Sequence, residues 1–201
     1  MGDSGSLLAS LRVLDLSAGE GDAVSRILAD LGAEVLKVEP PGGSPARTAL
    51  PRLGGTSVAF ALHNANKRSA LLDPVVEGDR QRLLDLAGAA DIVIDSGIPG
   101  RASAYGISCA DLAERFGHLV VLSVTDFGTT GPRSTWRATD AVLYALSSAL
   151  SRSGPPVGTP VLPPDGIASA TAAVQATWAV LVAYYNRLRC GRGDYIDFSR
   201  F

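Results

Sequence analysis

Residues 11–42 contain the feature that most limits what this chain can fold into. The apolar run Val13–Leu16 predicts a strand, and a turn with two glycines and a helix with apolar residues at helical spacing follow it. A second strand, Val35–Val38, ends in Glu39. This βαβ unit is typical of nucleotide-handling α/β domains, in which glycines let a ligand approach the backbone at a helix N-terminus.

The alternation of strands and helices continues along the chain. We expect further strands at 91–95, 118–124 and 194–199, and helices at 75–87, 108–116, 139–152 and 167–189. Apolar strands with intervening helices favour an α/β fold, a Rossmann-like doubly wound and mostly parallel sheet with helices on both faces. We expect residues 1–10 to form a flexible N-terminus and residues 11–201 to form one large domain.

Charge and cysteine content exclude several function classes. The net charge is −2 and no run of Lys and Arg exceeds two residues, which argues against a nucleic-acid partner. Cys109 and Cys190 lie far apart, so no metal site is expected. The most apolar segment, Ile167–Tyr185, is interrupted by polar residues and favours a buried helix, with Trp178 in the core, over a membrane span. These features predict a cytoplasmic protein without a membrane partner.

One interpretation of the first βαβ unit is a methyltransferase. The stretch from Asp15 to Gly21 resembles the first motif of the class I enzymes that use S-adenosylmethionine, and Glu39 is placed to hold ribose hydroxyls. A glycine turn after a strand is common, however, and a tight turn with a solvated Glu39 explains the same residues. The methyltransferase therefore stays an alternative.

Seven segments carry a second resemblance, which extends from Leu11 to Phe201. They are, in order, LRVLDLS, LADLGAEVLKVEPPGG, GGTSVAF, NANKRSALLD, ADIVIDSGIPG, LVVLSVTDFGTTGP and GRGDYIDFS. Their order and spacing resemble the N-terminal half of the family III CoA-transferases, which include formyl-CoA transferase, carnitine CoA-transferase and the α-methylacyl-CoA racemases. The resemblance implies an enzyme that moves coenzyme A between an acyl-CoA and a carboxylic acid.

The family nucleophile is an aspartate that attacks the acyl-CoA thioester, because a carboxylate is both a nucleophile and a leaving group. The resemblance places this position at Ser169, and the nearest carboxylate, Asp165, lies one helical turn earlier. Asp165 is thus a candidate nucleophile, with a helix cap as the alternative role. A serine at this position would need a base to remove its hydroxyl proton before it could attack the thioester. The residues leave open an active transferase, a degenerate active site, and a non-catalytic CoA-binding or assembly domain.

The resemblance also implies a set of CoA-binding positions. They are Ser17, Ala18, Leu72, Asp73, Ser96, Gly97, Ile98, Arg137 and Asp140. Basic residues that the family directs at the CoA phosphates appear here as Pro40, Val75 and Ala104. Lys67–Arg68 and Arg101 lie near the same loops and are candidate replacements.

Members of the family are about twice as long as this chain and form interlocked dimers. The resemblance therefore implies that these 201 residues are a fragment of a longer chain. Its expected partners are the acyl-CoA and carboxylic acid, the remainder of its own chain and a second copy in a homodimer.

Overall fold

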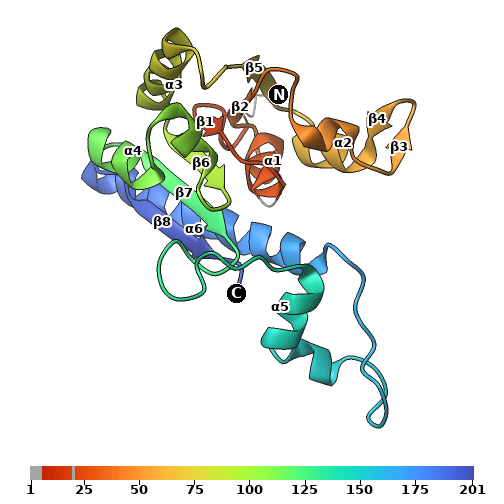
Figure 1. Ribbon diagram of the computed structural model, residues 1–201. Coiled ribbons are helices and arrows are strands. Elements are labelled where there is room, and N and C mark those ends of the chain that lie inside the picture. The colour runs from red at the N-terminus through yellow and green to blue at the C-terminus, as the bar shows by residue number, and fades with distance from the viewer. Residues whose placement is uncertain (1–5, 20) are drawn as a thin grey trace, which may run out of the picture.

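The computed structural model describes residues 6–19 and 21–201, and its centre is one parallel sheet. Six strands pair in the order β5-β2-β1-β6-β7-β8. They are β1 (Arg12–Asp15), β2 (Glu34–Glu39), β5 (Arg68–Leu71), β6 (Ile92–Ser96), β7 (Val120–Thr125) and β8 (Tyr195–Ser199). The parallel pairing confirms the predicted α/β class, and helices lie on both faces of the sheet (Figure 1).

Each face of the sheet carries its own hydrophobic core. Helices α1 (Asp22–Asp30) and α6 (Ile167–Cys190) pack on one face, and α3 (Glu77–Ala89) and α4 (Cys109–Arg115) pack on the other. Strand side chains alternate between the two cores, so that Ile92 and Ile94 lie with α1 and α6 while Val93 lies with α3 and α4. Because β6 and β7 are covered on both faces, all of their residues are buried.

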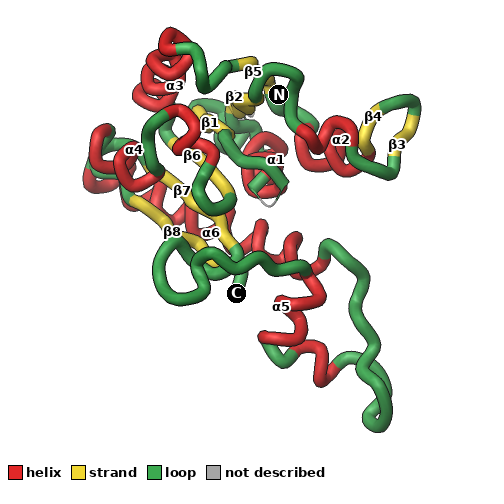
Figure 2. The backbone as a smooth tube through the Cα atoms, in the orientation of Figure 1, coloured by secondary structure: helices red, strands yellow, loops and turns green. Residues whose placement is uncertain are grey.

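Local signals in the sequence set several helix boundaries. Ser108 caps α4 in a reciprocal capping box with Asp111, and Gly191 ends α6 in the left-handed conformation with φ 74°. The helix predicted over 139–152 is divided, because Ser148 adopts a φ of 63° between α5 (Asp140–Leu146) and the 3-10 helix η3 (Ala149–Arg152). The smooth tube of Figure 2 shows this break below α5.

Residues 45–71 hold structure that the sequence did not predict. They form the 3-10 helix η1 (Pro45–Thr48), the two-stranded hairpin β3 (Arg52–Leu53) and β4 (Thr56–Ser57), helix α2 (Val58–Asn64) and strand β5. Strand β5 is an edge strand that pairs with β2, and three of its four residues are exposed. Its side chains therefore lack the apolar alternation that marks a half-buried strand.

Helix α6 differs from the expectation of a buried core helix. It is the one helix of the described residues that is long and apolar enough to cross a membrane by length and composition. One side packs on the sheet through Ala173, Ala176 and Val180, which are buried. The expectation that Trp178 lies in the core is wrong, because 66% of this residue is exposed on the opposite side.

The predicted flexible N-terminus falls partly outside the described residues, which exclude 1–5. Within the described part, the Ser6 hydroxyl donates a 2.6 Å hydrogen bond to the Leu31 carbonyl, and the Leu8 amide donates a 3.1 Å bond to the same oxygen. These bonds join the segment before β1 to the end of α1.

Candidate functional site

The loops after β1 and β6 meet at the switch point of the sheet, where the order of the strands reverses. Strands β2 and β5 lie on the β1 side of this point, and β7 and β8 lie on the β6 side. Open α/β sheets bind ligands in the crevice at the carboxyl ends of the strands at such a switch point. The Ala18 amide donates a 3.0 Å bond to the Ser96 hydroxyl, which donates back to the Ala18 carbonyl at 3.0 Å. The structure thus brings together the predicted positions 17–18 and 96–98.

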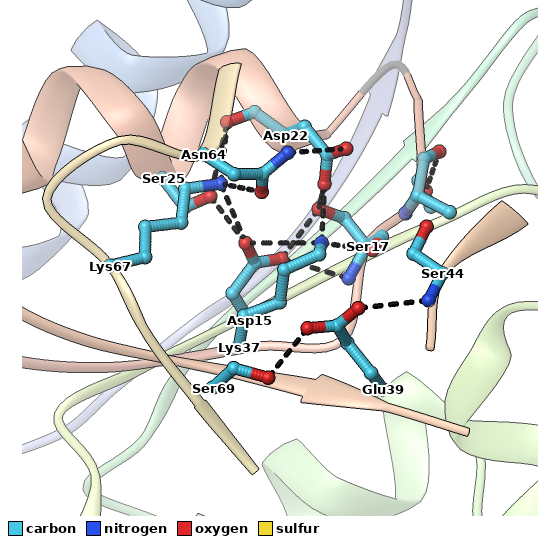
Figure 3. A network of polar contacts seen from close by, with 12 residues as sticks. Asp15, Ser17, Asp22, Ser25, Lys37, Glu39, Ser44, Asn64, Lys67 and Ser69 are labelled. Atoms are coloured by element: carbon cyan, nitrogen blue, oxygen red, sulfur yellow. Dashed lines mark hydrogen bonds and ion pairs between the residues drawn. The ribbon is translucent and has the colours of Figure 1, made fainter. Parts of the chain in front are cut away.

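A set of buried charged and polar side chains, here called the N-terminal network, lies directly behind the β1 loop (Figure 3). Its members are Asp15, Ser17, Asp22, Ser25, Lys37, Asn64 and Lys67. The Lys37 ammonium lies 2.5 Å from Asp22 and 3.6 Å from Asp15. The Lys67 ammonium lies 2.9 Å from Asp15 and also donates to the Asn64 side-chain oxygen. Two carboxylates and two ammonium groups therefore neutralise each other under the loop.

The pKa values in this network reflect burial opposed by pairing. Burial disfavours the charged form of Asp15, but the ammonium groups of Lys37 and Lys67 and the hydroxyl groups of Ser17 and Ser25 together hold its pKa below the usual range. Burial lowers the pKa of Lys67, and its carboxylate neighbours oppose this shift. Burial and pairing therefore act in opposite directions on the pKa values of Asp15 and Lys67, and the members of the network satisfy each other's hydrogen bonds.

This pairing corrects the expectation that Lys67–Arg68 could contact a phosphate. The Lys67 side chain is 2% exposed and is used inside the N-terminal network. Arg68 lies on β5 and pairs with Glu34 at the surface. Neither cation is placed at the crevice, so neither replaces the basic residues that the family directs at CoA phosphates.

Glu39 is also fully used by its neighbours, which weakens the methyltransferase alternative. One carboxylate oxygen accepts from Arg47 and from the Ser69 hydroxyl, and the other accepts from Arg47 and from the Ser44 amide, all at 2.5–2.8 Å. The Arg47 hydrogen bonds outweigh burial and lower the pKa of Glu39 to about 2. A carboxylate with two bonds at each oxygen has no free position for ribose hydroxyls.

A cavity of about 180 Å³ opens beside the crevice, at the carboxyl ends of β1 and β2. Its walls include Leu16, Val38, Pro40 and Pro74, and the 3-10 helix η2 (Arg101–Tyr105) closes the other side. The Tyr105 hydroxyl donates a 2.9 Å bond to the carbonyl of Leu72 and so ties η2 to the segment 72–75. The Asp73 carboxylate accepts from the Val75 amide at 3.0 Å and shapes the same turn.

Asp95, at the end of β6, holds the turn between the crevice and η2. Its carboxylate accepts from the backbone amides of Ser96, Arg101 and Ala102 at 2.7–2.9 Å and is fully buried. Burial raises the pKa of Asp95 against these hydrogen bonds. A Cβ at Gly100 would lie 2.5 Å from an Asp95 oxygen, so the close approach requires glycine there.

Arg137 lies on the opposite side of the crevice, where β6 and β7 end. It lines a narrow pocket together with Gly97, Ile98 and Thr125, and its side chain is exposed to solvent. The structure therefore places this predicted cation next to predicted backbone positions. Glycine with φ 88° at position 97 leaves this part of the crevice wall without a side chain.

A second set of polar groups, the C-terminal network, consists of the buried Asp140 and the partly buried Asp126, Ser169 and Arg200. The Ser169 hydroxyl donates to Asp140 at 2.6 Å and accepts from the Arg200 guanidinium at 2.6 Å. Arg200 pairs with Asp140 at 3.1 Å and with Asp126 at 2.8 Å. Burial disfavours the charged form of Asp140, but the hydrogen bonds from Ser169 and the Ala168 amide and the charge of Arg200 hold its pKa below the usual range.

The structure separates the two candidate nucleophile positions. The alternative role of Asp165 as the cap of α6 is wrong, because Gly166 occupies the N-cap with φ 93° and has no side chain to accept a hydrogen bond from the first-turn amides. Asp140 caps the helix instead, accepting from the Ala168 and Ser169 amides at 2.9 and 3.2 Å. Asp165 is exposed, and within residues 6–19 and 21–201 no hydrogen bond or ion pair joins it to another residue.

Sequence reasoning missed two members of the C-terminal network, Asp126 and Arg200. Asp126 directly follows β7, and Arg200 directly follows β8. The available signal was their common position, since both come directly after parallel strands that end at the same edge of the sheet. Within the described residues, no group of three or more His, Cys, Asp or Glu is arranged to hold a metal ion.

Comparisons with known proteins agree with this geometry. The family model described as CoA-transferase family III matches residues 8–201. The probable CoA-transferase Rv1866 of Mycobacterium tuberculosis is 73% identical over 193 residues, which are 94% of this chain and 24% of that protein. The human succinyl-CoA:glutarate CoA-transferase is 33% identical, and the match covers 94% of this chain and 44% of that enzyme.

Solved structures show the same fold over nearly the whole chain. A CAIB/BAIF family protein from Brucella suis superposes with a TM-score of 0.89 at 29% identity, covering 98% of this chain and 54% of that one. Rv3272 from M. tuberculosis superposes with a TM-score of 0.86 at 31% identity, covering 98% of this chain and 56% of that one. The chain thus spans between a quarter and about half of the length of these relatives.

Proposed function

The chain belongs to CoA-transferase family III, and from this premise we propose that it is the large acyl-CoA-binding domain of an enzyme that moves coenzyme A between an acyl-CoA and a carboxylic acid. The observation that carries the proposal is the switch point of the sheet, with one pocket at the ends of β1 and β2 and another at the ends of β6 and β7. At this point the segments 17–18 and 96–98 are joined by the hydrogen bonds between Ala18 and Ser96. A crevice at such a point presents backbone groups to a nucleotide at the carboxyl ends of the strands.

The two ends of this crevice suit the two ends of an acyl-CoA. On the β1 and β2 side, an apolar cavity with one cation accepts a nucleotide. On the β6 and β7 side, Arg137 and the segment 97–98 line the same pocket as Asp126, which directly follows β7. The C-terminal network, at the ends of β7 and β8, holds the position where the family carries its nucleophile.

Ser169 does not supply the covalent step in this proposal. Attack on a thioester requires the hydroxyl to lose its proton, and its hydrogen-bond acceptor, Asp140, has a lowered pKa and is a weak base. A serine ester would also return the acyl group less readily than an anhydride, because an alkoxide is a poorer leaving group than a carboxylate. The domain therefore binds acyl-CoA without forming an acyl adduct at Ser169.

The size of one relative supports a second unit that completes the enzyme. The matched 193 residues make up 24% of Rv1866 but 44% of the human succinyl-CoA:glutarate CoA-transferase, so Rv1866 is nearly twice as long. We propose that the natural protein of this chain likewise holds two such units and that the other unit contributes the nucleophile. The proposal includes a dimer with a second copy and a cytoplasmic location.

A non-catalytic CoA-binding or assembly domain is the second candidate, and the pairing of Ser169 with Asp140 and Arg200 favours it. This candidate has the same CoA-binding site, and it differs only in that the bound CoA takes no part in the transfer reaction. A transfer assay on the full-length protein distinguishes the two candidates. If the unit that contains Ser169 only supports assembly, a substitution that removes its CoA site leaves turnover unchanged.

Calorimetric titration of the protein with CoA, acetyl-CoA and S-adenosylmethionine tests the proposal. We expect saturable binding of CoA and acetyl-CoA, no binding of S-adenosylmethionine, and binding that is several-fold weaker in Arg137→Ala. Arg82→Ala is the matched control, because Arg82 is an exposed arginine of α3. Absence of CoA binding would refute the proposal, and a stable acyl adduct on Ser169, detected by mass spectrometry after incubation with acetyl-CoA, would refute its catalytic part.

A further inference from the structure

Among the residues that the structure describes, Arg101 is the one charged side chain in the walls of the β1 and β2 cavity. The residue is half-buried, and within residues 6–19 and 21–201 its guanidinium makes no hydrogen bond or ion pair. The other walls include the apolar side chains of Leu16, Val38 and Pro40 and the ring of Tyr105. A guanidinium that no carboxylate neutralises favours an anion beside an apolar group.

The position of Arg101 is fixed by its backbone and not by its side chain. Asp95 accepts hydrogen bonds from the Arg101 and Ala102 amides at 2.9 Å, and so anchors the first turn of η2 to the end of β6. In a 3-10 helix, side chains three residues apart lie one above the other. Arg101 and Ala104 are three apart on η2 and both line the cavity. Arg101 therefore presents its charge on the same face of η2 as position 104.

The neighbouring residues determine which kind of ribose this cavity can recognise. In open α/β sheets, a free acidic side chain at the end of the second strand accepts hydrogen bonds from ribose hydroxyls, whereas an arginine there accommodates a ribose phosphate. The acidic side chain at the end of β2 is Glu39, and both of its oxygens are occupied by Arg47, Ser44 and Ser69. Pro40, which follows it into the cavity, offers neither a charge nor an amide proton.

We propose that Arg101 is a specificity-determining residue, which selects a nucleotide whose ribose carries a phosphate. In the acyl-CoA-binding site proposed above, on which this inference rests, that group is the 3′-phosphate of CoA. The protein then prefers CoA over 3′-dephospho-CoA, and this preference comes from one side chain on η2.

Titration with CoA and with 3′-dephospho-CoA tests this inference directly. Loss of one charge-assisted hydrogen bond at a half-buried site corresponds to about tenfold in affinity. We expect the wild-type protein to bind CoA about tenfold more tightly than 3′-dephospho-CoA, and Arg101→Ala to bind both equally. Arg101→Lys keeps the charge and should retain part of the preference, whereas the control Arg82→Ala should retain all of it.

The outcomes separate this inference from the proposed function. If the wild-type protein binds CoA and 3′-dephospho-CoA equally, or if Arg101→Ala keeps the wild-type preference, the role of Arg101 is refuted while the CoA-binding function stands. If the wild-type protein binds neither compound, both fail. Thermal unfolding of Arg101→Ala and of Arg101→Gln, which keeps a polar side chain, confirms that a loss of preference comes from a folded protein.

Discussion

The N-terminal and C-terminal networks lie at the same edge of one sheet, yet they satisfy their buried carboxylates in different ways. In the N-terminal network, Asp15 and Asp22 pair with two ammonium groups, those of Lys37 and Lys67, and each accepts one backbone amide, from Ser17 or Gly19. In the C-terminal network, Asp126 and Asp140 share Arg200 and accept three backbone amides, from residues 138, 168 and 169. Backbone donors stay in place when a side chain is removed, so the C-terminal network, which has more of them, should lose less stability when its cation is removed.

The difference also bears on how each network relates to the crevice. The N-terminal network is closed on itself and supports the β1 loop from behind (Figure 3). The C-terminal network includes Ser169, to which the resemblance assigns the position of the family nucleophile, and it joins the start of α6 to the residues after β7 and β8. The N-terminal network therefore stabilises the β1 loop, and the C-terminal network lies where the resemblance predicts the covalent step of the family. The four predictions below test this division.

The largest effect is expected from Lys37→Met. The Lys37 side chain is 3% exposed, and its removal leaves the Asp22 carboxylate buried without its 2.5 Å partner. Breaking a buried ion pair on one side costs about 3–5 kcal/mol of unfolding free energy. Urea denaturation measures this loss, and Arg68→Met is the control, since its pair with Glu34 is exposed and should contribute about 0–1 kcal/mol. Equal effects of the two substitutions would contradict the proposed dependence on buried pairing.

A smaller loss is expected from Arg200→Met, although this side chain is 4% exposed and pairs with two carboxylates. The amides of Ala168 and Ser169 still donate to Asp140, and the amide of Ala138 still donates to Asp126. We expect a loss of about 2–3 kcal/mol of unfolding free energy. A loss larger than that of Lys37→Met would show that the backbone donors do not substitute for the cation, and the contrast between the networks would fail.

These two networks also show what the sequence could and could not predict. The strands predicted at 13–16, 91–95 and 118–124 correspond to β1, β6 and β7 with slightly shifted ends, because their apolar runs reflect burial on both faces of the sheet. The strand order then brings segments 17–18 and 96–98 together, which is why the crevice could be predicted from the resemblance. The edge strand β5 could not, because an exposed strand leaves no apolar pattern.

Charged residues were harder to assign because charge does not reveal burial. Lys67 and Arg101 looked equivalent as candidates for a phosphate contact, yet Lys67 is buried in the N-terminal network and Arg101 lines a cavity. Arg200 lies 31 residues beyond Ser169, and no periodic signal joins the two. Contacts between residues so far apart follow from the tertiary fold, and a single sequence carries no local pattern for them.

A third prediction concerns the pH dependence of the Glu39–Arg47 pair, which adjoins the N-terminal network. The pKa of Glu39 in the folded protein is about 2, below the ordinary value of 4.5. The stabilisation by the pair is therefore present above pH 4.5 and is lost as the pH falls towards 2. Because Arg47 is 44% exposed, solvent screening limits the loss to about 1–2 kcal/mol. Urea unfolding at several pH values should show a smaller acid-dependent loss for Glu39→Gln than for the wild type. A constant difference between the two proteins from pH 7 to pH 3 would contradict it.

The smallest effect is expected from Ser169→Ala, and it separates a structural from a chemical role of the C-terminal network. The substitution removes the hydrogen bonds of the hydroxyl to Asp140 and Arg200, but both charged partners stay paired with each other at 3.1 Å. We therefore expect a loss of about 1 kcal/mol of unfolding free energy and unchanged affinity for CoA. Asp165→Asn is the control for stability, because Asp165 is exposed and should leave the unfolding free energy unchanged. If Ser169→Ala abolished acyl transfer in the full-length protein while folding normally, the hydroxyl would be a reacting group, and the division between a supporting network and a nucleophile supplied elsewhere would have to be withdrawn.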